Sequence, residues 1–161
     1  MTAMRHRLGR RHREGGASAV EFALVMPVLV LIISGIVGFG FVFAQQIALG
    51  NAARQAARSA VVDGPVCGAT GSPGSGIKGQ AQTDATTIGL NNAGVTVTVS
   101  RVPTAGLPSD PCGSSTNKPC AGSAVNDNLQ VRLGYTSTLA LPFFQPTFNL
   151  TATGMFRCEF S

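Results

Sequence analysis

Apolar and polar residues are segregated along this chain, and the longest apolar run lies near the N-terminus. Residues 22–44 contain no charged side chain, and a carboxylate, Glu21, lies directly before them. About 20 apolar residues, rising about 1.5 Å each, cross the roughly 30 Å hydrocarbon core of a bilayer. The pattern therefore predicts a transmembrane helix over residues 17–44.

Two features inside this run modify the predicted helix. Pro27 leaves the carbonyl of Ala23 without a helical donor, which predicts a local kink or unwinding. Ser34 and Gly38 form a pair of small residues one turn apart. Such a pair either lets a second helix approach closely or only reflects how common glycine is in membrane helices.

The pattern then changes to an amphipathic extension of the same helix over residues 45–63. Polar side chains recur every three or four positions, and small apolar ones take the opposite face. The polar positions are Asn51, Arg54, Gln55 and Arg58, and the apolar ones are Leu49, Ala52, Ala53, Ala56 and Ala60. The alanine face suits close packing, either on the chain's own domain or on neighbouring subunits. Asp63, Gly64 and Pro65 are expected to end the helix.

Residues 64–161 predict a small extracytoplasmic domain. A weak helical pattern over residues 78–90 is followed by segments that alternate apolar and polar side chains, as strands do. These segments are residues 95–102, 128–139 and 147–160. Since three strands packed on a helix are viable where a two-stranded ribbon is marginal, we expect an α+β fold. The layout is pilin-like by analogy: a long N-terminal transmembrane helix continuing into a domain with an antiparallel sheet.

The net charge of +5 is concentrated before the apolar run. Residues 1–16 hold five arginines against one glutamate, whereas residues 17–161 hold seven cations and six anions. The basic character therefore does not indicate nucleic-acid binding. Residues 1–16 are expected to be a cytoplasmic leader, because positive charge before a span favours the inner side. The expected location is the cytoplasmic membrane, with one pass and the C-terminal domain outside.

The four cysteines all fall on the expected outer side, where disulfides persist. They are Cys67, Cys112, Cys120 and Cys158. Three pairings are possible. The short, flexible connection favours Cys112 with Cys120, which leaves Cys67 with Cys158. No C-x-x-C spacing occurs, so disulfides are favoured over a zinc site.

The residues needed for common enzymatic chemistry are missing from the outer domain. Both histidines, His6 and His12, lie in the leader, which rules out a Ser-His-Asp triad or a His-ligated metal outside. The acids are scattered singly, and no Gly-Lys-Ser/Thr follows the glycines of residues 71–79. We therefore expect no enzyme, no cofactor, no metal and no small-molecule substrate.

The residues around Glu21 resemble a known processing signal. With Glu21 as the fifth residue, Ala17 becomes the first and Gly16 precedes it, after a basic leader. This spacing resembles the type IV prepilin signal, in which a prepilin peptidase cuts after the glycine. The run from Gly16 to Pro27, GASAVEFALVMP, and the small-residue helix over residues 44–64 are similar to the TadE-like family of minor pseudopilins of the Flp (Tad) pilus.

This resemblance implies a cut after Gly16 and a role for Glu21 in assembly. In a bundle of such helices, the carboxylate of Glu21 would pair with the new amine of Ala17 on a neighbour, which offsets the cost of burying both charges. The implied partners are the membrane, a prepilin peptidase, other pilins or pseudopilins, and the Tad assembly machinery.

Three alternatives stay open at this point. Glu21 could be an interfacial residue of an ordinary signal anchor. Secretory cleavage after Ala44 is a second option, although an apolar region of more than 20 residues exceeds the usual 7–15 of a signal peptide. In function, the alternative is a membrane-anchored or secreted surface binding protein, such as an adhesin, that does not polymerise.

Overall fold

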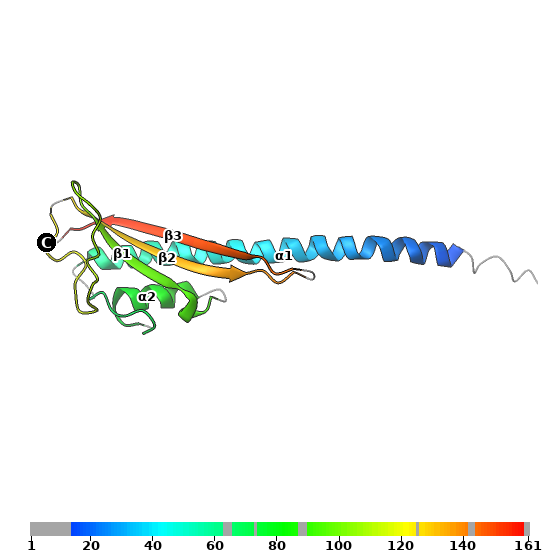
Figure 1. Ribbon diagram of the computed structural model, residues 1–161, viewed down its shortest axis with the longest axis horizontal. Helices are drawn as coiled ribbons and strands as arrows, with labels where there is room; N and C mark the ends of the chain where they lie inside the picture. The colour runs from blue at the N-terminus through cyan, green and yellow to red at the C-terminus, as the bar shows by residue number, and fades with distance from the viewer. Residues whose placement is uncertain are drawn as a thin grey trace, which may run out of the picture.

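The fold is a long helix with a small sheet packed along its C-terminal half (Figure 1). The computed structural model describes residues 14–62, 66–72, 74–86, 90–124, 126–141 and 144–159. The elements are α1 (Glu14–Val61), α2 (Gly76–Ala85), the short 3-10 helix η2 (Asn92–Gly94), β1 (Thr96–Val102), β2 (Asn128–Thr138) and β3 (Thr147–Arg157). The predicted α+β class, with a long N-terminal helix and an antiparallel sheet, is confirmed.

Helix α1 is continuous for 48 residues and passes through Pro27 without interruption. The helix is therefore not interrupted at the proline, and the kink predicted at Pro27 stays a prediction. The helix is long and apolar enough to cross a membrane, in agreement with a single-pass anchor. The helix stop expected at residues 63–65 lies outside the described residues.

The two halves of α1 have different surroundings. Every side chain over residues 16–33 is exposed, whereas the C-terminal half is buried on one face. The predicted polar face is exposed and the alanine face is buried, so the amphipathic pattern is confirmed. The chain's own sheet covers the alanine face: Gly154 of β3 lies so close to the backbone of Ala53 that a Cβ would collide with it.

The sheet has the order β1-β2-β3, with both neighbouring pairs antiparallel. The helices cover one face, with α1 along β2 and β3, and α2 beside α1 and β1 (Figure 1). The inward residues alternate along each strand, as the sequence predicts; they are Val97 and Val99 of β1, Leu129, Val131 and Leu133 of β2, and Leu150 and Ala152 of β3. The predicted strands agree with the observed ones to within a few residues. The short helix begins and ends earlier than predicted, at Gly76 and Ala85.

Two glutamines of α1 join this helix to the sheet. The hydroxyl of Ser137 donates to Oε1 of Gln45 at 2.6 Å, and both residues are buried. Gln46 donates from its side chain to the carbonyl of Thr151 at 2.9 Å. Buried polar groups lose free energy unless they are hydrogen-bonded, so these contacts fix the position of β2 and β3 along α1.

All four cysteines form disulfides, but the predicted pairing is wrong. The bonds are Cys67–Cys112 and Cys120–Cys158, with Cα atoms 5.5 and 5.7 Å apart. The cause is the docking of residues 111–120 on the segment that follows α1. The amide of Cys67 donates to the carbonyl of Asn117 at 2.7 Å, and this contact brings Cys112 rather than Cys158 to Cys67. Cys120 is left facing the end of β3.

Candidate functional site

The residues of the predicted processing signal lie in the first turns of α1. Gly16, Ala17 and Glu21 are exposed, and a Cβ built on Gly16 meets nothing within 4 Å. Residues four apart on a helix share one face, so Ala17 and Glu21 lie one above the other. Together with Gly16 they form a small, accessible segment ahead of the apolar surface.

Glu21 has no partner within the part of the chain that the structure describes. Its carboxylate makes no hydrogen bond or ion pair there, and the whole surface around it over residues 16–33 is exposed and free of other charges. A carboxylate at the edge of a membrane-spanning segment is costly unless it is hydrated or paired. Any partner other than water therefore has to come from the leader or from another molecule.

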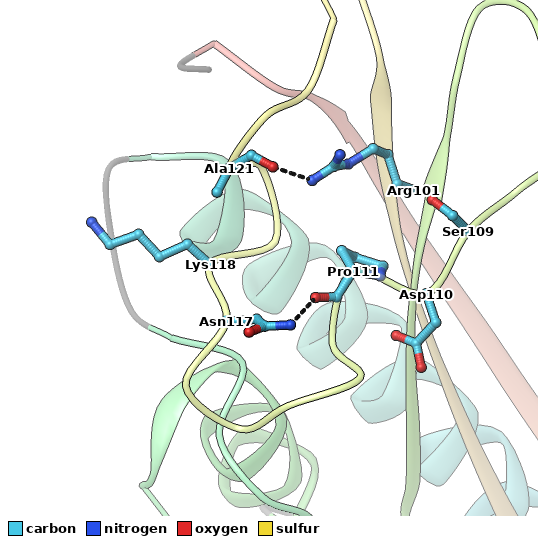
Figure 2. Close-up of a pocket in the computed structure, with 7 residues that line it drawn as sticks. All are labelled: Arg101, Ser109, Asp110, Pro111, Asn117, Lys118 and Ala121. Carbon is cyan, nitrogen blue, oxygen red and sulfur yellow. Dashed lines mark hydrogen bonds between the residues drawn. The ribbon is translucent and has the colours of Figure 1, made fainter.

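A surface pocket lies at the opposite end of the molecule, beside the disulfide-linked loops. It encloses about 370 Å³. The residues around it are Arg101, Ser109, Asp110, Pro111, Asn117, Lys118 and Ala121 (Figure 2). In Figure 2 the side chains of Lys118 and Asp110 point away from each other, so their charges do not converge on one point. The pocket is open and polar, without an arranged pair of charged groups.

Arg101 holds this end of the domain together. Its guanidinium donates to the carbonyls of Pro119, Ala121 and Gly122, at 2.6, 2.8 and 3.4 Å. Sequence reasoning missed this role, although a signal existed. In the segment VTVTVSRV the arginine occupies the same alternate positions as the buried valines, and it therefore points toward the inner side of the sheet.

The described residues offer no arrangement for catalysis at this pocket. Within the described ranges no histidine accompanies Ser109, since the two histidines of the chain, His6 and His12, lie outside those ranges. The carboxylate of Asp110 accepts a hydrogen bond from the amide of Cys112 at 2.8 Å. Within the described ranges, no group of three His, Cys, Asp or Glu side chains could hold a metal ion. The described residues around this pocket therefore do not form a recognisable active site.

A second hollow, of about 380 Å³, lies on the sheet face that the helices leave open. Its lining is made of hydroxyl, amide and guanidinium groups from all three strands, namely Thr96, Thr98, Ser100, Gln130, Arg132 and Thr151, with Gly134. Polar and apolar atoms share its surface about equally. Arg132, the one charged residue in this lining, is exposed, so no buried charge defines a ligand there.

The comparison with protein families identifies the N-terminal segment. A family model described as TadE-like protein matches residues 16–58. The match begins at Gly16, includes Glu21 and Pro27, and ends on the amphipathic part of α1. It confirms the resemblance seen in the sequence. No curated protein and no solved structure matches the chain.

Proposed function

We propose that this chain, whose residues 16–58 match the family model described as TadE-like protein, is a minor pseudopilin that helps to assemble a Tad pilus. The family match supports a protein associated with the Tad pilus. The finer assignment as a pseudopilin rests on Glu21. An exposed carboxylate with no partner among the described residues, at the start of an apolar helix, is of no use to a simple anchor.

In this proposal a prepilin peptidase cuts after Gly16 and removes the basic leader. The cut creates an amine at Ala17, one helical turn from Glu21 and on the same face. Each helix then carries a positive and a negative group side by side. Two parallel helices can therefore exchange ion pairs between the amine of one and the carboxylate of the other.

The orientation follows from the charge distribution. The arginine-rich leader stays in the cytoplasm, α1 crosses the membrane once, and the disulfide-containing domain lies outside. The exposed apolar surface over residues 16–33 is covered by lipid before assembly and by other pilin helices afterwards. The partners are the prepilin peptidase, other pilins or pseudopilins, and the Tad assembly machinery.

The test is the substitution Glu21→Gln, which keeps size and polarity but removes the charge. An anchor should insert as well or better with this change. A pseudopilin should still insert, but its association with other pilins should weaken, because removing one partner of a buried ion pair costs about 3–5 kcal/mol. The readouts are co-purification of other pilins and the number of pili per cell.

Glu14→Gln is the matched control, since it makes the same chemical change in the segment that the cut discards. We expect it to leave both readouts unchanged. Normal partner recovery and normal piliation with Glu21→Gln would refute the assigned role and favour the surface binding protein.

A further inference from the structure

The connection between β2 and β3 lies beside a part of α1 that belongs in the membrane. The side chain of Leu139 occupies the space where Gly38 would carry a Cβ. The rings of Phe39 and Phe148 meet edge to face, with centroids 6.1 Å apart. Figure 1 shows the β2–β3 hairpin pointing along α1 toward its N-terminal half. The space that the small residue Gly38 leaves beside α1 is therefore filled by this hairpin and not by a second helix.

The position of these contacts along α1 sets their depth. Gly38 and Phe39 follow Glu21 by 17 and 18 residues, which corresponds to about 26 Å along the helix. The hydrocarbon core of a bilayer is about 30 Å thick, and helix tilt shortens the distance across it further. If Glu21 lies at the inner edge of this core, the residues that touch Gly38 and Phe39 lie within its outer part.

The hairpin continues past this level. Leu141 lies two residues beyond Leu139, and an extended chain advances about 3.3 Å per residue. Ser34 and Gly35 are the first residues of α1 that are partly buried, consistent with a neighbour at that height. We call residues 139–141 and 144–148 the hairpin tip.

The hairpin tip has the composition of a membrane-inserted element. Residues 133–156 contain no charged side chain, and the first charges on either side are Arg132 and Arg157. The side chain of Phe144 is 56% exposed although it is aromatic. Helix α1 likewise has no charge between Glu21 and Arg54, a distance of about 50 Å. Helix and hairpin thus form one charge-free zone.

Two backbone hydrogen bonds pair the two sides of the hairpin tip. The amide of Leu139 donates to the carbonyl of Pro146 at 2.9 Å, and the amide of Leu141 donates to that of Phe144 at 3.1 Å. Each bond satisfies backbone groups that would otherwise need water, which lowers the cost of placing them in hydrocarbon. The polar contacts of Gln45 and Gln46 with the sheet begin just above the tip, at the height expected for the headgroups.

We propose that the hairpin tip is inserted into the leaflet on the domain side whenever α1 spans a bilayer, so that lipid acyl chains contact Phe144. This inference rests on the membrane anchorage of α1, but not on processing or pilus assembly. It gives the domain a second membrane contact, which fixes its orientation against the bilayer. The tip has to leave the lipid when the subunit leaves the membrane.

The chain contains no tryptophan, so one introduced indole reports on one position. Three variants of the full chain are compared in phosphatidylcholine nanodiscs that hold one copy each, with and without brominated acyl chains. Phe144→Trp tests the tip and Leu29→Trp tests the middle of α1. Leu107→Trp is the aqueous control, because Leu107 is 88% exposed and follows β1 at the end of the sheet away from the hairpin.

We expect Phe144→Trp to show blue-shifted tryptophan fluorescence. Brominated acyl chains should quench the same fraction of this fluorescence as they quench in Leu29→Trp. Leu107→Trp should respond to aqueous acrylamide and not to bromine. If Phe144→Trp instead behaves like Leu107→Trp while Leu29→Trp is quenched, the tip proposal is wrong and the anchor stands. If Leu29→Trp is not quenched, the anchor fails and the tip proposal fails with it. A further sample holds several copies per disc. If Phe144→Trp is protected from acrylamide only in that sample, and bromine does not quench it, the tip makes contacts between copies and the proposal is wrong.

Discussion

The observed disulfide pairing predicts different consequences for two double substitutions that each remove two cysteines. Cys67→Ser with Cys112→Ser removes one bond and leaves Cys120–Cys158 intact. Cys112→Ser with Cys120→Ser takes one cysteine from each bond and therefore removes both. The pairing expected from the sequence predicts the reverse, because there the second double substitution would remove a single bond.

The magnitude follows from the lengths of the closed loops. The bonds link residues 45 and 38 positions apart, and each restrains the unfolded chain by about 4 kcal/mol in the entropy model. The first double variant should therefore lose about 4 kcal/mol and the second about 8 kcal/mol. Since small domains are stable by about 5–15 kcal/mol, the second variant should be close to unfolded.

Two measurements check this prediction on the full chain in detergent micelles. Urea unfolding can be followed through Tyr135, which is the single tyrosine and is packed against the core. Thiol labelling without reductant should find no free thiol in the first variant and two in the second. Two free thiols in the first variant and none in the second would refute the pairing, whatever the stabilities are.

Two further substitutions test how the sheet is attached to α1, with the urea midpoint as the measurement. Gly154→Val should destabilise the domain by about 1–3 kcal/mol or more, because the new side chain collides with the backbone at Ala53. Gly113→Val should change the stability much less, because a Cβ at Gly113 meets nothing within 4 Å. Ser137→Ala should cost about 1–3 kcal/mol because it leaves the buried amide oxygen of Gln45 without its donor, whereas Ser100→Ala on the open face should be nearly neutral. If the two variants of a pair shift the urea midpoint equally, the contact tested by that pair does not stabilise the domain as described.

Much of the fold could be predicted because its signals are local. The alternation in VTVTVSRV specifies β1, and the spacing of Arg54 and Arg58 against the alanines specifies which face of α1 is buried. Each of these patterns is complete within one element. Neighbouring residues alone therefore indicate both the type of element and its inward side.

The features that could not be predicted depend on how distant segments dock. The pairing of Cys112 with Cys67 follows from the hydrogen bond between Cys67 and Asn117, which no local pattern contains. The depth of the hairpin tip could not be predicted from a local pattern either. It depends on the register between β2 and β3 and on the position of these strands along α1. Gly38 illustrates the difference: its small size indicates a close approach, but the neighbour proved to be Leu139.

The most direct test of the proposed pseudopilin role is the mass of the N-terminal peptide of the membrane-bound protein. We expect an N-terminus at Ala17, and we expect Gly16→Arg to retain the whole leader because the peptidase accepts only a small residue before the cut. An intact leader in the wild-type protein would refute the pseudopilin role and indicate a plain anchor. An N-terminus at Gln45 would contradict it in favour of secretion.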